Sequence, residues 1–185
     1  MEFYGPIIRP GTDADSVFIE VTAGCTHNGC TFCNFYRDTP LFNHRRDAYG
    51  GSLENRFRFL DEVYQAIRQR VGADYPVWIK LNSSDEEPGG LSNDDFIWMG
   101  KQLVQQGMNA IEVNGNKWQM HPFKEHAYYF DVASRLQKEV KTDIILTGGL
   151  RNREDIEKAT KAGISYFGFA RPFIQNIDFL KTSEK

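Results

Sequence analysis

Short apolar runs and helix-forming stretches alternate along most of this chain, and this alternation limits the fold more than any other feature. The apolar runs are rich in β-branched residues and predict strands at 77–81, 110–113, 143–147 and 166–170. Helical spacing of apolar residues predicts helices between and after them, at 92–106, 123–140, 152–162 and 174–180. Such regular alternation is typical of βαβ units around a parallel sheet.

Two further elements precede this pattern. The run SVFIEV at 16–21 predicts one more strand, and Ser52 is expected to cap a helix that ends near Gly72. We therefore expect an α/β fold, namely a partial (β/α) barrel of the TIM type with about five parallel strands. Five strands cannot close an eight-stranded barrel, so two sheet edges are expected to stay open and to favour self-association.

The composition is that of an ordinary globular protein, with 41% hydrophobic and 25% charged residues. A net charge of −3 gives no indication of a nucleic-acid partner. No apolar run approaches the roughly 18 residues of a membrane helix, and the first residues lack the plan of a signal peptide. We therefore expect a cytoplasmic protein with no nucleic-acid or membrane partner.

Polar and glycine-rich residues follow each predicted strand, and in a (β/α) barrel ligands bind at that rim. These residues are Asn82–Asp85, Asn114–Asn116, Gly148–Gly149 and Arg171. Backbone N–H groups at a glycine turn bind phosphate, and an arginine on the next strand adds a cation suited to a phosphate contact. The same residues are also consistent with a tight strand-to-helix turn and a surface arginine, so the pattern alone leaves both interpretations open.

The segment CTHNGCTFC places Cys25, Cys30 and Cys33 within nine residues. Soft thiolates select iron–sulfur clusters or zinc, and three thiolates leave one iron of a [4Fe–4S] cluster open for another ligand. A zinc site would need a fourth ligand, for which His27 is near enough in sequence. Three inert thiols are the remaining interpretation, and the spacing does not decide between the three.

From about residue 39 to residue 185, several separated segments resemble the old yellow enzyme family of FMN-dependent NAD(P)H oxidoreductases. The segments are NHRRDAYGGSLENRFRFLDEV, PVWIKLNSSD, GMNAIEVNG, ILTGGLRNREDIEKA and GFARPFI. The resemblance implies a TIM barrel with FMN at its C-terminal rim, NAD(P)H as the electron donor and a small-molecule acceptor. It also implies that Gly148, Gly149, Ala170 and Arg171 face the flavin phosphate.

The same resemblance places Lys80 where the family usually has an arginine near the pyrimidine edge of the flavin. A lysine cannot make the forked contact of an arginine, and it could equally extend from a strand end to solvent. The family's substrate-polarising His-x-x-Asn or His-x-x-His pair has no counterpart, because CTFCNFYRDTP stands in its place. The histidines at 27, 44, 121 and 126 match no catalytic position and are expected in loops or at the surface.

Residues 3–38, with YGPIIRP and SVFIEVTAGCTHNGCTFCNFYRD, resemble the opening of a radical S-adenosylmethionine protein. This second resemblance implies a [4Fe–4S] cluster on Cys25, Cys30 and Cys33, with S-adenosylmethionine on the open iron. The chain would then consist of a segment at 1–38 and a flavin-barrel portion at 39–185, together forming one compact unit.

Three functions follow from these observations. The first is an FMN-binding NAD(P)H-dependent oxidoreductase, expected to be truncated and weakly active or inactive. The second is a radical S-adenosylmethionine enzyme fragment. The third is a folded, non-catalytic remnant or binding module.

Overall fold

The computed structural model describes residues 49–86, 90–115, 121 and 125–182. The chain divides into two compact units, residues 1–60 and 61–185. The predicted strand at 16–21 and the predicted boundary near residue 38 lie outside the described residues. In the part of the chain that is described, no helix is long and apolar enough to cross a membrane.

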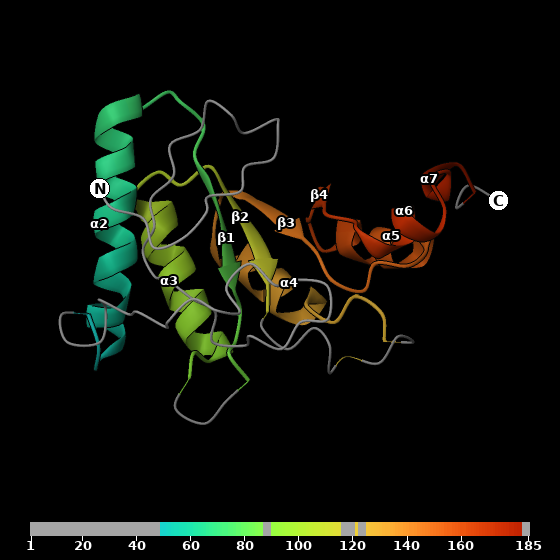
Figure 1. Cartoon of the computed structure of the whole chain (residues 1–185), viewed down its shortest axis with the longest axis horizontal. Coiled ribbons are helices and arrows are strands. Elements are labelled where there is room, and N and C mark those ends of the chain that lie inside the picture. The colour runs from blue at the N-terminus through green and yellow to red at the C-terminus, as the bar shows by residue number, and fades with distance from the viewer. Residues whose placement is uncertain (1–48, 87–89, 116–120, 122–124, 183–185) are drawn as a thin grey trace, which may run out of the picture. The chain divides into compact units, whose positions relative to one another are not determined.

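Four parallel strands form one sheet in the second unit (Figure 1). They are β1 (Trp78–Asn82), β2 (Ala110–Asn114), β3 (Asp143–Leu146) and β4 (Tyr166–Phe167). Their order in the sheet is their order in the sequence, and every pairing is parallel. This confirms the predicted α/β class with helical crossovers between parallel strands.

Helices precede, separate and follow the strands. They are α2 (Leu53–Val71), α3 (Asn93–Gln105), α4 (Phe130–Glu139), α5 (Arg153–Lys161), α6 (Arg171–Gln175) and α7 (Phe179–Thr182). The predicted cap at Ser52 is confirmed, because its hydroxyl accepts a hydrogen bond from the Asn55 amide. Ser92 and Asn152 likewise begin α3 and α5 with complete capping boxes.

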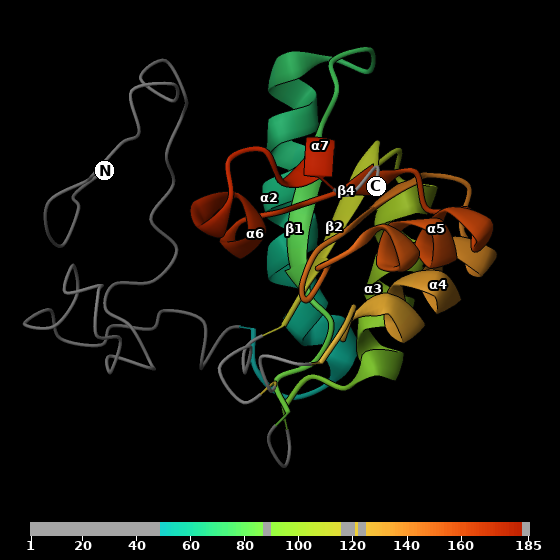
Figure 2. The ribbon, with the colours of Figure 1, turned by 90° about the vertical axis from the view of Figure 1, so that its right-hand side faces the viewer.

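The hydrophobic core lies between one face of the sheet and the helices α3, α4 and α5, which lie on the same side of the strands (Figure 2). Ile111, Val113, Ile144 and Leu146 alternate along β2 and β3 and are almost fully buried. Burying each such side chain stabilises the fold by roughly 1.5–3 kcal/mol. This alternation fixes the register of β2 and β3, because a slip of one residue would turn these side chains away from the helices.

The opposite face of the sheet carries the other set of alternating residues and is more polar. Lys80, Glu112, Ile145 and Tyr166 are register partners across the four strands. Trp78 and Tyr166, on the two outer strands, have exposed fractions of 64% and 52%. Side chains on this face therefore remain accessible to solvent. In a barrel this face would line the interior, but the four described strands do not close one.

Two predicted boundaries were wrong by several residues. Helix α4 begins at Phe130 instead of residue 123, because Ala127 has a φ of 44° and the preceding described residues are not helical. Strand β4 ends at Phe167, although the Gly168 amide still donates to the Leu146 carbonyl at 2.8 Å.

The single helix predicted at 174–180 is in fact two short ones, α6 and α7. Asn176 is extended, with a φ of −149°, and its side-chain oxygen accepts a hydrogen bond from the Asp178 amide. This local bond offers the backbone an alternative to helix continuation, which explains the break.

Candidate functional site

The carboxyl ends of the four parallel strands meet at one edge of the sheet, so the polar residues predicted there do share a rim. Asn82 and Asn114 are register partners at the ends of β1 and β2, and the Asn114 side-chain amide donates to Asn82 Oδ1 at 3.4 Å. The Ser83 amide donates to the Asn114 carbonyl at 2.6 Å. These bonds hold the β1 and β2 ends of the rim together.

The glycine pair after β3 adopts a conformation that favours glycine. Gly148 and Gly149 have φ values of +84° and +71°. A Cβ atom on either residue would lie 2.6 Å from the ring of Tyr128, and one on Gly148 would be as close to Tyr129. The Gly149 carbonyl accepts a hydrogen bond from the Ala127 amide at 2.9 Å. The loop is therefore fixed against the segment before α4, and two consecutive glycines allow that close approach.

Arg171 begins α6, one residue after Ala170, and its guanidinium reaches the same segment. Arg171 Nη2 donates to the Tyr128 hydroxyl at 3.1 Å. Since the ring of Tyr128 lies against Gly148 and Gly149, this tyrosine connects the glycine pair to the arginine on the next strand unit. Four of the predicted site residues, Gly148, Gly149, Ala170 and Arg171, are thus gathered at the β3–β4 end of the rim.

The orientation of Tyr128 is set by a neighbouring histidine. The rings of His121 and Tyr128 are stacked, with centroids 4.2 Å apart and an interplanar angle of 4°. His121 Nδ1 lies 2.9 Å from Glu125 Oε2, and its Nε2 lies 3.6 Å from Glu86 Oε1. His121 is in a loop, as predicted, but its side chain is only 19% exposed, so the alternative expectation of a surface histidine does not apply to it.

Tyr129 fills the space beneath the rim. Its side chain is buried, and a Cβ atom on Gly115 or Gly148 would lie 2.6 Å from its ring or hydroxyl. Burial raises the pKa of the Tyr129 phenol above its ordinary value, and the nearby Tyr128, Glu86 and Glu125 raise it further. Among the described residues, its hydroxyl has no hydrogen-bond partner.

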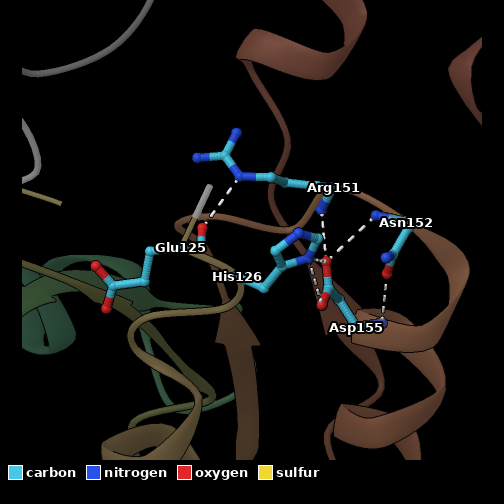
Figure 3. A network of polar contacts seen from close by, with 5 residues as sticks. All are labelled: Glu125, His126, Arg151, Asn152 and Asp155. Atoms are coloured by element: carbon cyan, nitrogen blue, oxygen red, sulfur yellow. Dashed lines mark hydrogen bonds and ion pairs between the residues drawn. The ribbon is translucent and has the colours of Figure 1, made fainter. Parts of the chain in front are cut away.

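A polar network anchors the same segment to the start of α5 (Figure 3). The buried carboxylate of Asp155 accepts hydrogen bonds from the backbone amides of Arg151 and Asn152 at 2.8 and 3.2 Å. It also lies 2.9 Å from His126 Nδ1. Arg151 Nε donates to the Glu125 carbonyl at 3.0 Å. The residues before Tyr128 are therefore held by the turn that follows the glycine pair.

Lys80 lies away from the β3–β4 end of the rim. It is on β1, and its Nζ atom lies 2.9 Å from Glu112 Oε1 on β2. Three strand spacings of about 4.8 Å separate β1 from β4, so Lys80 is roughly 14 Å from the β4 unit that carries Arg171. The structure therefore does not bring Lys80 together with the glycine pair and Arg171.

The predicted metal ligands Cys25, Cys30 and Cys33 lie outside the described residues, and the predicted cluster stays a prediction. Within the described ranges, no group of three or more His, Cys, Asp or Glu side chains is arranged to hold a metal ion.

A cavity of about 560 Å³ lies between α4 and α5 and is lined by residues of those helices and of the turn after α5. Arg135, Lys138, Lys158 and Lys161 give it a basic lining, with Asp131 opposite in sign. None of its lining residues belongs to the strand ends, so this cavity is separate from the rim site.

The sequence pattern missed Tyr128 and the histidine that orients it. The available signal was the aromatic pair at 128–129 just before a helix, which helical spacing instead assigned to the helix itself. The structural role of Tyr128 depends on residues 21 and 43 positions further along the chain, Gly149 and Arg171. Local periodicity carries no information about such distant contacts.

A parallel sheet with a glycine turn and an arginine at its carboxyl rim is typical of proteins that bind phosphorylated cofactors. The model of the NADH:flavin oxidoreductase / NADH oxidase family matches residues 19–185. The chain belongs to this family, and FMN is the cofactor that the family indicates. The match begins upstream of the predicted boundary at residue 38 and includes all three cysteines.

Two curated relatives illustrate the similarity. The NADPH dehydrogenase of Geobacillus sp. (strain WCH70) is 31% identical over 147 residues, covering 75% of this chain and 41% of the relative. The NADH-dependent flavin oxidoreductase iliE of Hypocrea jecorina (strain QM6a) is 34% identical over 154 residues, covering 75% and 38%. The chain thus spans less than half the length of these relatives.

Solved structures give the same fold. A 2-naphthoyl-CoA reductase in complex with 2-naphthoyl-CoA is 29% identical with a TM-score of 0.62, covering 77% of this chain and 23% of that one. An old yellow enzyme homologue from Zymomonas mobilis has a TM-score of 0.55 at 21% identity, covering 77% and 41%, and this likeness shows the fold alone. These likenesses confirm the predicted partial (β/α) barrel.

Proposed function

We propose that this chain supplies the FMN phosphate site of an NAD(P)H-dependent flavin oxidoreductase, and that the phosphate is held between the glycine pair and Arg171. The observation that carries this proposal is the position of Tyr128, which touches Gly148 and Gly149 with its ring and Arg171 with its hydroxyl. Through this contact, the two candidate phosphate-binding features lie within one side chain's length of each other.

The residues present fit a phosphate group. A glycine turn can direct backbone N–H groups toward an anion, and a guanidinium makes strong charge-assisted hydrogen bonds to phosphate oxygens. Any larger residue at 148 or 149 would collide with Tyr128, so the glycine pair cannot be replaced without opening this end of the rim. Ala170 would leave room beside Arg171, because its side chain is a single methyl group.

Lys80 would serve the other end of the cofactor. Its distance of roughly 14 Å from the β4 unit suits an elongated ligand that is bound at both ends. FMN, when bound, accepts hydride from NAD(P)H and passes it to an acceptor. A cation at Lys80 would stabilise negative charge at the pyrimidine edge, although Glu112 already neutralises part of its charge at 2.9 Å.

The proposal includes an electron donor and an electron acceptor. NADH or NADPH is proposed as the electron donor from the names of the relatives, which are an NADPH dehydrogenase and an NADH-dependent oxidoreductase. A small molecule is proposed as the acceptor. Turnover is proposed to be slow, because the family's histidine pair has no counterpart at the matching place in this sequence.

Self-association is also proposed. Within the described residues, β1 and β4 are edge strands, and each carries a large exposed aromatic residue, Trp78 and Tyr166. The unpaired backbone groups of an edge strand can form hydrogen bonds with a strand of another chain.

Comparing FMN with riboflavin, which lacks the phosphate, tests the proposed site. We expect wild-type protein to bind FMN more tightly than riboflavin in a fluorescence-quenching titration, and Arg171→Ala to remove most of that difference. Arg153→Ala is the matched control, since Arg153 is an exposed arginine on α5 that pairs only with Glu157 among the described contacts. Equal affinity of the wild type for the two flavins, or no binding of either, would refute the proposed site.

A further inference from the structure

Tyr128 lies between the glycine pair and Arg171, the two features proposed to bind the phosphate. Its ring is in van der Waals contact range of the backbone at Gly148 and Gly149, and its hydroxyl is 3.1 Å from Arg171 Nη2. Neither the family resemblance nor the phosphate pattern in the sequence includes this residue. Only the folded structure shows that it lies beside the glycine pair and Arg171.

The hydrogen bond between Arg171 and Tyr128 leaves the phenol proton available. A guanidinium can only donate, so the Tyr128 oxygen must be the acceptor in this bond. A phenol has one O–H donor of its own, which this bond does not use. Accepting from a cation polarises the O–H group and makes it a better donor to an anion. The Tyr128 hydroxyl can therefore donate a hydrogen bond to a phosphate oxygen bound next to Arg171.

The ring is held in a defined place, so this donor has little freedom to move away. His121 stacks on it at 4.2 Å, and Tyr129 meets it edge-on with centroids 4.7 Å apart. His121 is itself held by Glu125 at 2.9 Å. A donor fixed in this way loses little conformational entropy when it binds a ligand.

We propose that Tyr128 is a phosphate-binding residue, donating its hydroxyl hydrogen bond to a phosphate oxygen of FMN while its oxygen orients Arg171. This inference rests on the proposed function, since it extends the same phosphate site by one residue. It assigns three kinds of contact to the phosphate: backbone N–H groups of the glycine turn, the Arg171 guanidinium and the Tyr128 hydroxyl.

The test is Tyr128→Phe, which removes the hydroxyl and keeps the ring that packs on the glycine pair and on His121. FMN and riboflavin affinities are measured by fluorescence quenching on the full chain. We expect FMN to bind about tenfold more weakly to the variant, because a hydrogen bond to a charged group is worth about one factor of ten or more. Riboflavin affinity should not change. Tyr75→Phe is the matched control, since Tyr75 is exposed and precedes β1.

The possible results separate the inference from the proposed function. An unchanged ratio of FMN to riboflavin affinity in Tyr128→Phe would show that the tyrosine only packs. An increased ratio would show that the phenol competes with phosphate for Arg171, and either result overturns the inference. If Arg171→Ala still lowers the ratio, the proposed phosphate site survives. If Arg171→Ala has no effect, the site itself is wrong, and the inference is refuted with it.

Discussion

Lys80 and Glu112 are register partners on β1 and β2, and the Nζ and Oε1 atoms of their side chains are 2.9 Å apart. The lysine side chain is 55% exposed and that of the glutamate 22% exposed, so solvent screens the pair only in part. The positive charge of Lys80, which is proposed to face the flavin, is therefore partly neutralised by the Glu112 carboxylate on the next strand.

Removing the carboxylate should change the reduction potential of bound FMN. In Glu112→Gln, Lys80 keeps its charge without a neutralising partner, and we expect the reduced, negatively charged flavin to be favoured. The midpoint potential, measured by spectroelectrochemistry, should become more positive than in the wild type. Lys80→Met, which removes the cation, should shift it in the opposite direction. Identical potentials in all three proteins would contradict a role for Lys80 at the pyrimidine edge.

Substitution of the glycine pair should destabilise the protein by more than backbone strain alone. Gly148→Ala combines a left-handed φ with a methyl group 2.6 Å from two aromatic rings. We expect a loss of about 2–4 kcal/mol in the free energy of unfolding, measured by urea denaturation. Gly72→Ala is the control, because Gly72 has a similar φ of +83° and no atom within 4 Å of the added methyl group. Its expected cost is about 1–2 kcal/mol, and equal losses at both sites would argue against close packing of Tyr128 and Tyr129.

Replacing Tyr129 should alter the stability of the protein at alkaline pH. Burial raises the pKa of this phenol in the folded state, so folding favours the neutral form. The associated stability is fully present below the ordinary tyrosine pKa of about 10 and is lost as pH rises above it. In Tyr129→Phe, we expect a smaller fall in melting temperature between pH 9 and pH 11 than in the wild type.

At pH 7 the same substitution should leave stability unchanged or slightly increased. The hydroxyl of Tyr129 is buried without a hydrogen-bond partner among the described residues, and removing an unsatisfied polar group carries no loss of a bond. Tyr75→Phe, at an exposed position, provides the comparison. A large loss of stability at pH 7 in Tyr129→Phe would show that the hydroxyl has a partner after all.

Exposed aromatic residues on the edge strands should promote self-association. We expect multi-angle light scattering to show species larger than the monomer, and Trp78→Lys to shift the distribution toward the monomer, since charged residues on an edge oppose strand pairing. Tyr75→Lys should have no such effect, because Tyr75 is similarly exposed but lies outside the sheet. A monodisperse wild-type monomer would contradict this prediction.

The sequence predicted the strands well because their β-branched, alternating residues reflect burial on one face of a sheet. Ile111 and Val113 are examples, since their spacing of two residues corresponds to the side that α3 and α4 cover. The helix cap at Ser52 was also local enough to be predicted. Such features depend only on neighbours within a few positions.

The loop before α4 could not be predicted in the same way. Its course depends on Asp155, which binds His126 across 29 positions, and on Gly149, which accepts a bond from Ala127. Apolar and aromatic residues in this loop imitate helical periodicity, so the pattern favoured a helix where long-range hydrogen bonds impose another conformation. Tyr128, the residue that joins the two halves of the candidate site, was missed for this reason.

The order of the strands in the sheet repeats their order in the sequence, and each is joined to the next by its own helix. Every strand–helix unit therefore touches mainly the units that were synthesised just before and just after it. An array of this kind can gain or lose a unit at either margin without rerouting the chain through its interior.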